Sequence, residues 1–267
     1  MKINILFTIA LLFLFAANAF AHEYWFEPET FFLQPQQSTA VHLYVGDGLI
    51  KDREERPFQF KMTPFFQLLS VNQTQDLTVK LNDGANPVYN FAADEPGNYL
   101  LAMKRDWSYI KIEAAKFEDY LREDGMEYII TAREKLGERQ KEGRERYSRY
   151  LKSLLQVGNQ QDGVYQKQLN LKLEIMPLEN PYSKKIGETL KFQVLFDGKP
   201  LAGKTVFADN RASKTQKITT DKNGKFLMKI ERSGLWLVRL VYMERCQADC
   251  NDADWESFWG AITFGAK

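Results

Sequence analysis

The spacing of hydrophobic and polar residues divides residues 22–267 into a β-rich part, a charged segment with helical spacing, and a second β-rich part. Short runs of β-branched and aromatic residues, bounded by turn-forming residues, are typical of strands. Residues 22–113 have this pattern, and turns are expected at Asn82-Asp83-Gly84 and Glu95-Pro96-Gly97. The strands expected there are Thr39–Val45, Leu77–Leu81 and Tyr99–Met103.

The spacing changes in residues 114–160, which we interpret as a charged helical linker. Phe117, Tyr120 and Leu121 have the spacing of one helix face. A second apolar stripe with the same period consists of Tyr147, Tyr150, Leu151, Leu154 and Leu155. Glycines interrupt the segment, so two or three helices are expected. The charged stretch 133–149 is either a solvated helix face or a docking surface for an anionic partner.

The β pattern returns in residues 161–267. Alternation of apolar and polar residues predicts a half-buried strand over Leu169–Ile175. Further strands are expected at Leu190–Phe196, Thr205–Ala208, Lys225–Ile230, Leu235–Tyr242 and Trp259–Phe264. The sequence therefore predicts a mainly β fold, with two immunoglobulin-like or transthyretin-like β-sandwich domains (22–113 and 161–267) joined by the helical segment.

Residues 1–21 have the pattern of a secretory signal peptide: Lys2, an apolar run, and two small-x-small sites that end at Ala19 and Ala21. We therefore expect export to the periplasm. No second apolar stretch is long enough to span a membrane. Loss of Lys2 leaves 35 basic residues of the original 36, against 35 acidic residues. This neutral balance predicts no binding to nucleic acid.

His22 is one of two histidines, and it follows the second cleavage site directly. Cleavage after Ala21 would make it the N-terminal residue, with an α-amine beside its imidazole. Cleavage after Ala19 would place it third, after Phe20 and Ala21, where four nitrogens in a square suit Cu²⁺ or Ni²⁺. In the alternative interpretation, His22 is simply the first ordered residue of a strand.

His42 and Glu23 are further candidate metal ligands. His42 could join His22 and the amine in a three-nitrogen site, or it could be a structural residue of its strand. A plain hairpin turning near Gln36 would place His42 opposite about residue 31. His22 would then lie ~30 Å away, so shared ligation requires the first strand to break or switch sheets. Glu23 adjoins His22, but successive strand side chains point to opposite faces.

Cys246 and Cys250 are the only cysteines. In an exported protein such a pair is expected to form a disulfide. The alternative, a pair of metal ligands, lacks two further ligands nearby.

The sequence contains no motif for nucleophilic, zinc-protease or phosphate-binding chemistry, and we expect a protein that is not an enzyme. The five tryptophans could line a carbohydrate groove or fill the sandwich cores.

Several motifs along the chain resemble those of one family. They are Ala21-His22-Glu23-Tyr24-Trp25-Phe26-Glu27-Pro28, Gly46, Gly143–Tyr150, Asn180-Pro181-Tyr182, Phe196–Gly203, Thr220–Gly224 and Asp254–Trp259. They resemble an exported bacterial family of domains of unknown function that is related to the substrate-specific components of nickel and cobalt uptake systems. The resemblance covers all of residues 22–267.

The resemblance implies a periplasmic protein that handles Ni²⁺ or Co²⁺, with His22 at the position of the metal-capturing N-terminal histidine. The expected function is binding of Ni²⁺ or Co²⁺, with Cu²⁺ as second choice, in support of an inner-membrane metal uptake system. The alternatives are an envelope structural or protein-interaction module and a carbohydrate-binding module.

Overall fold

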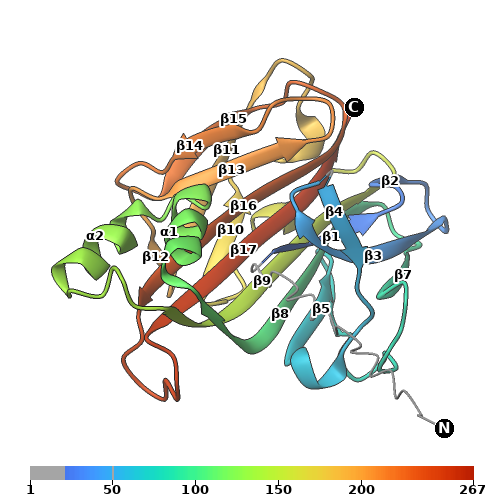
Figure 1. The fold of residues 1–267 in the computed structure, drawn as a ribbon. Coiled ribbons are helices and arrows are strands. Elements are labelled where there is room, and N and C mark those ends of the chain that lie inside the picture. Colours follow the sequence, from blue (N-terminus) through green and yellow to red (C-terminus); the bar gives the residue numbers. More distant parts are fainter. Residues whose placement is uncertain (1–21, 50) are drawn as a thin grey trace, which may run out of the picture.

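A central sheet takes strands from both halves of the chain and organises the whole molecule (Figure 1). The computed structural model describes residues 22–49 and 51–267, apart from the side chains of residues 51 and 52. In this part of the chain the central sheet has nine strands. Eight run in the order β14 (Gln216–Thr219), β13 (Thr205–Asn210), β16 (Gly234–Arg245), β17 (Trp255–Ala266), β9 (Gly143–Val157), β8 (Gly97–Ile112), β5 (Phe65–Leu69) and β6 (Thr74–Asp76). The ninth, β2 (Phe32–Leu33), pairs with β9.

A smaller sheet, which we call sheet A, covers one face of the central sheet. Its strands are β1 (Glu23–Pro28), β3 (Ser38–Asp47), β4 (Lys51–Glu55) and β7 (Tyr89–Ala92). Phe26 and Leu43 of sheet A pack in one hydrophobic cluster with Leu101, Leu151 and Leu155 of the central sheet. This cluster is the first of two main cores.

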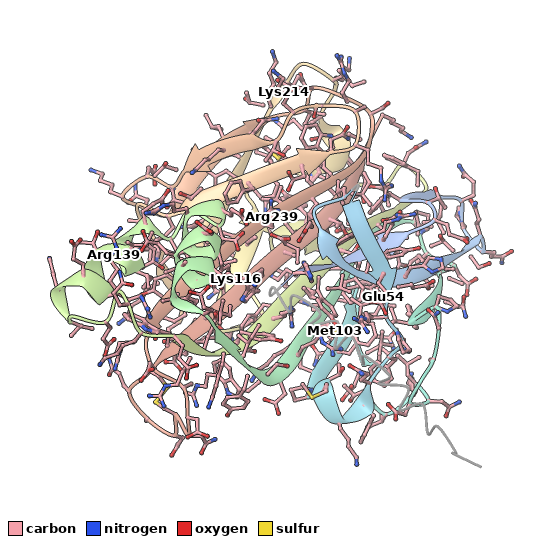
Figure 2. All side chains as sticks on the ribbon, in the orientation of Figure 1. Glu54, Met103, Lys116, Arg139, Lys214 and Arg239 are labelled. Atoms are coloured by element: carbon pink, nitrogen blue, oxygen red, sulfur yellow. A yellow bond between two sulfur atoms is a disulfide. The ribbon has the colours of Figure 1, made fainter. Side chains whose placement is uncertain are left out.

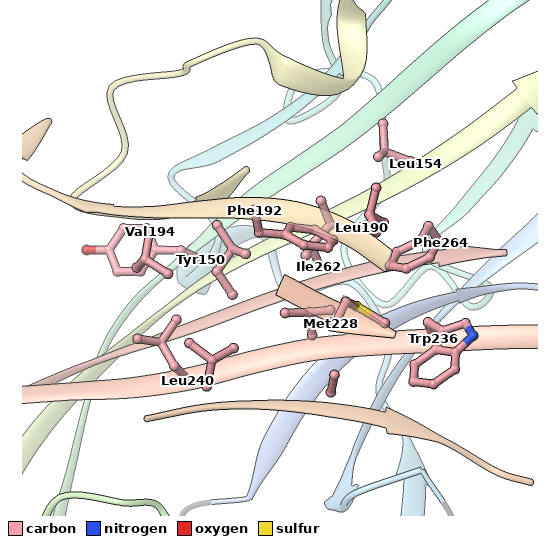
Figure 3. Packing of buried hydrophobic residues seen from close by; sticks show 14 of the residues in the cluster. Tyr150, Leu154, Leu190, Phe192, Val194, Met228, Trp236, Leu240, Ile262 and Phe264 are labelled. Atoms are coloured by element: carbon pink, nitrogen blue, oxygen red, sulfur yellow. The ribbon is translucent and has the colours of Figure 1, made fainter. Parts of the chain in front are cut away.

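A third sheet, sheet C, covers the opposite face of the central sheet. It contains β10 (Leu173–Pro177), β11 (Thr189–Phe196), β12 (Lys199–Pro200) and β15 (Lys225–Lys229). Figure 3 shows Phe192 and Val194 of β11 packed with Ile262 and Phe264 of β17 in the second core. The two cores lie on opposite faces because neighbouring residues of one strand point in opposite directions: Leu154 belongs to the second core and Leu155 to the first.

The predicted helix over residues 147–155 is wrong, because these residues form part of β9. A strand buried on both faces has apolar residues at successive positions, and such a run contains pairs with helical spacing by chance. Leu151 and Leu155 face the first core, whereas Tyr150 and Leu154 face the second. The helical stripe is therefore the combined pattern of two strand faces.

Helix α1 (Ala114–Glu123) and helix α2 (Glu127–Lys135) lie beside sheet A on the same face of the central sheet (Figure 1). Phe117, Tyr120 and Leu121 are buried, as their spacing predicted, against Met243 and Trp259. Gly143 allows this close approach, since an added Cβ would lie 2.3 Å from the Phe117 ring. None of the helices in the described ranges is long and apolar enough to cross a membrane. Short 3-10 turns occupy Phe60–Met62, Val164–Gln166 and Pro181–Ser183.

The mainly β fold with packed sheets agrees with the predicted β-sandwich class. The expected domain boundaries do not separate the sheets from one another. The central sheet contains strands from 22–113, from 114–160 and from 161–267. Only the first part of the expected linker is helical, and Leu77–Leu81 is a turn after β6 rather than a strand. The expected signal peptide and both cleavage sites lie outside the described residues.

Candidate functional site

His22 lies immediately before β1, at the open end of sheet A. Its neighbour Glu23 pairs with Gly46 of β3, which brings His22 level with Asp47. Nδ1 of His22 lies 2.6 Å from Oδ1 of Asp47, and the two side chains are 31% and 58% exposed. Arg149 of β9 donates a hydrogen bond from Nη2 to the backbone carbonyl of His22, at 3.1 Å. The imidazole and the carboxylate are therefore held together at a surface that solvent reaches.

The buried carboxylate of Glu23 points to Arg239 rather than to His22, although the charge of Asp47 is among the causes that raise its pKa. It pairs with Arg239 of β16, which also holds Asp209 at 2.7 Å and Asp124 at 3.5 Å. Figure 2 shows Arg239 between α1 and sheet A, over the central sheet.

The group around Arg239 contains three carboxyl groups and one guanidinium. Burial raises the pKa of Glu23 and raises that of Asp124 well above its usual range, in spite of the neighbouring guanidinium. Burial by itself would lower the pKa of Arg239, but the three carboxylates raise it. One cation therefore compensates only part of the charge that three ionised acids would have.

His42 lies away from His22, and the plain-hairpin geometry expected for it is wrong. His42 pairs in register with Glu27 rather than with residue 31, because β1 ends at Pro28 and the chain then crosses to the central sheet as β2. His42 is still five residues along β3 from Asp47, or about 16 Å. Its Nδ1 lies 2.6 Å from Oε1 of Glu55. The first strand does switch sheets, but the two imidazoles are not brought together.

Within residues 22–49 and 51–267, no group of three or more His, Cys, Asp or Glu side chains is arranged to hold a metal ion. The pair of His22 and Asp47 would need a further ligand from outside these side chains. An α-amine on His22 would be a ligand of this kind, if the chain were cleaved after Ala21. Cys246 and Cys250 form the expected disulfide, with Cα atoms 5.9 Å apart.

We use the name junction for the region between sheet A and α1, over the central sheet. It is formed by Glu23 and Tyr24 of β1 and by Arg149, Arg239 and Trp259 of the central sheet. Pattern analysis of the sequence did not identify it. A cavity of about 10 Å³, enough for about one water molecule, lies in it against Glu23, Tyr24, Arg239 and Trp259. The site of His22 and Asp47 lies at its edge, through the contact of His22 with Arg149.

Glu145 of β9 is a buried acid on the same face as the junction. Its Oε1 accepts hydrogen bonds from Tyr120 and Ser257, while Oε2 is buried without a partner. Burial raises the pKa of Glu145 to about 7, against the lowering effect of these hydrogen bonds. Its partners lie 25 and 112 residues away along the chain, so no local motif could have indicated this position.

The tryptophans do not form the exposed platform that a carbohydrate groove would need. Trp25, Trp236, Trp255 and Trp259 are at most 3% exposed. Trp107 is partly buried, with its ring against Phe258 and under the Arg146 guanidinium. The tryptophans therefore serve mainly to fill the cores.

Comparisons with known proteins give a family but no activity. A family model described as Domain of unknown function (DUF4198) matches residues 19–244, and this description does not mention nickel or cobalt. No curated protein matches the chain. Among solved structures, the chain is similar to the three N-terminal domains of the bacteriophage RB49 Highly Immunogenic Outer Capsid protein (Hoc), with 9% identity and a TM-score of 0.18. That match covers 91% of this chain and 59% of the other, and its low score says nothing about function.

The family match includes sheet A, both helices, sheet C and most of the central sheet, and it stops before β17. Since the matched residues make up most of the chain, the protein belongs to the family described as Domain of unknown function (DUF4198).

Proposed function

We propose that the protein captures a divalent transition metal in the periplasm through a processed N-terminus that begins at His22. The observation that carries the proposal is the pairing of His22 with Asp47, at 2.6 Å on an accessible surface. Cleavage after Ala21 would add the α-amine to this imidazole and carboxylate. Two nitrogens and one oxygen then converge on one point.

This ligand set suits Ni²⁺ or Co²⁺ first and Cu²⁺ second. Imidazole is a good ligand for nickel and copper, and the remaining positions would be open to water or to a receiving protein. A metal ion binds imidazole and amine nitrogens only when they are unprotonated, so capture should weaken as the pH falls. The contact between Arg149 and the His22 carbonyl fixes the backbone next to the amine.

The captured ion is cargo in this proposal, and its receiver is an inner-membrane metal uptake system. Support for this role comes from the resemblance of the motif Ala21-His22-Glu23-Tyr24-Trp25 to nickel and cobalt uptake components. The open geometry of a two-residue site also favours transfer over permanent storage, since few bonds must break for release.

The test is calorimetric titration of the exported protein with Ni²⁺, Co²⁺ and Cu²⁺, after intact mass has identified its N-terminus. A matched form extended by four glycines before His22 keeps both side chains but moves the amine away. We expect the extension and Asp47→Asn each to weaken affinity at least about tenfold, or ~1.4 kcal/mol. His42→Asn is the control and should bind as the wild type does. Equal affinity of the extended and the natural form would contradict the proposal.

A further inference from the structure

Arg105 and Arg149 are two buried guanidinium groups that lie side by side without an acidic partner. They face each other in register on β8 and β9. Arg105 is 5% exposed and Arg149 is 6% exposed. Like charges directly opposite each other on neighbouring strands are destabilising, and burial increases the cost of each charge.

Each of the two arginines has one neutral hydrogen-bond acceptor among the described residues. Arg105 donates to Oε1 of Gln59, and Arg149 donates to the carbonyl of His22. Nη1 of Arg105 and Nε of Arg149 are buried and have no hydrogen-bond partner within residues 22–49 and 51–267. Two donors are therefore unsatisfied at one place in the molecule.

Other buried arginines show what a satisfied guanidinium looks like in this protein. Arg146, also on β9, holds Glu256 at 2.6 Å and donates to two backbone carbonyls. Arg133 donates to the carbonyls of Glu138 and Lys141. Arg239 has three carboxylates around it. The contrast singles out Arg105 and Arg149 as a pair that lacks an anion.

Aromatic rings hold both guanidinium groups in place. The Tyr24 ring lies 5.1 Å from the Arg105 guanidinium carbon and 4.2 Å from that of Arg149. Tyr147 provides a second ring for Arg149, at 4.6 Å. These contacts compensate part of the burial cost and fix the orientation of the charges. They do not saturate the N–H donors, which lie around the edge of each planar group.

One further positive charge, on Arg56, and one acid, Glu145, lie within electrostatic reach of the pair. Burial lowers the pKa of the Arg105 guanidinium, and the nearby charges of Arg149 and Arg56 lower it further, against the opposing effect of Tyr24. Arg56 pairs with Glu54, but its Nε is also buried without a partner. Its side chain is 41% exposed, so this third positive charge is accessible to solvent.

We propose that Arg105 and Arg149 bind a small oxyanion of the carboxylate or phosphate class, at the end of the junction next to His22. Guanidinium groups present paired N–H donors that match two oxygens of either class. The two fixed groups would each contribute donors to one anion, and Arg56 would attract it from solvent. This site uses neither the His22 nor the Asp47 side chain, although Arg149 also holds the His22 backbone.

The test is calorimetric titration of the exported protein with inorganic phosphate and with acetate, at constant ionic strength and with a metal chelator present. We expect saturable binding of at least one anion, and the tighter of the two identifies the class. Arg105→Gln and Arg149→Gln should each weaken it at least tenfold. Arg232→Gln removes an equal charge from an exposed arginine that bonds only to a backbone carbonyl, and it should change affinity less than twofold.

Two further measurements distinguish loss of the anion site from poor folding of a variant and from loss of metal binding at His22. The Nε–H resonances of Arg105 and Arg149 in the wild-type protein should shift on addition of the anion, which needs no variant that folds poorly. His22→Ala should leave anion affinity unchanged, because Arg149 contacts only the backbone of His22. Absence of saturable binding, or equal weakening by Arg232→Gln and Arg149→Gln, would overturn the proposal whether or not His22 binds metal.

Discussion

Both faces of β9 carry charged side chains. The two faces differ in whether the buried polar atoms of these side chains have an ion-pair or hydrogen-bond partner. On the face toward sheet C, Arg146 pairs with Glu256 and Lys152 pairs with Glu174, each at 2.6 Å. On the face toward sheet A and α1, Arg149 and Glu145 each have a buried atom with no partner. Satisfied buried charges are typical of a stable fold, whereas each unsatisfied buried atom requires an explanation, which for Arg149 is the anion site that we propose.

The largest expected effect comes from breaking a pair on the satisfied face. Lys152→Met leaves the Glu174 carboxylate buried without its cation, which should cost about 3–5 kcal/mol of unfolding free energy in chemical denaturation. The double variant with Glu174→Gln removes both charges and should recover part of this loss. If Lys152→Met were nearly neutral, the satisfied face would not depend on its ion pairs.

The next effect concerns the buried acid on the unsatisfied face. Glu145 has a pKa of about 7 in the folded protein and an ordinary pKa of 4.5. Its ionisation therefore costs stability, which falls as the pH rises from about 4.5 to about 7 and stays low above that. Over this pH range, the free energy of unfolding of the Glu145→Gln variant should therefore fall by about 3 kcal/mol less than that of the wild type.

Denaturation of the Glu145→Gln variant and the wild type at pH 4.5 and pH 8 measures this change. Glu54→Gln, at an exposed carboxylate, is the control and should follow the wild-type pH dependence. Equal pH dependence of all three proteins would show that Glu145 ionises without cost in the folded state.

The smallest expected effect concerns Arg149, on the face of β9 toward sheet A and α1. Arg149→Met loses the hydrogen bond to the carbonyl of His22 and the contacts of the guanidinium with the Tyr24 and Tyr147 rings, but it also removes one of two facing buried charges. Because no carboxylate is left unpaired, the cost should be only about 1 kcal/mol in anion-free buffer. A loss as large as that of Lys152→Met would mean that Arg149 serves the fold as Lys152 does.

The sequence could indicate much of the β structure. Thr39–Val45 and Leu190–Phe196 lie within β3 and β11, because turn residues and alternation mark a strand with one open face. Leu169–Ile175 shows how far alternation can mislead, since β10 begins only at Leu173. The amides of Leu169 and Leu171 donate instead to the Glu174 carboxylate, an interaction that periodicity does not describe.

The candidate site was predictable only in part. His22 was found because a cleavage site and a rare residue coincide in the sequence. The junction was not found, because its contacts join residues far apart in the chain, such as Glu23 and Arg239 at a separation of 216 residues. Burial of Arg105 and Arg149 likewise depends on how β8 and β9 pair, which no local pattern specifies.

The position of β17 has a consequence for the order of events during synthesis. This strand lies between β16 and β9, in antiparallel register with the first and parallel with the second. Until residues 255–266 have left the ribosome, the central sheet is two separate pieces with open edges, and neither main core has its full set of side chains. This arrangement delays completion of the fold until residues 255–266 are available to join the two pieces.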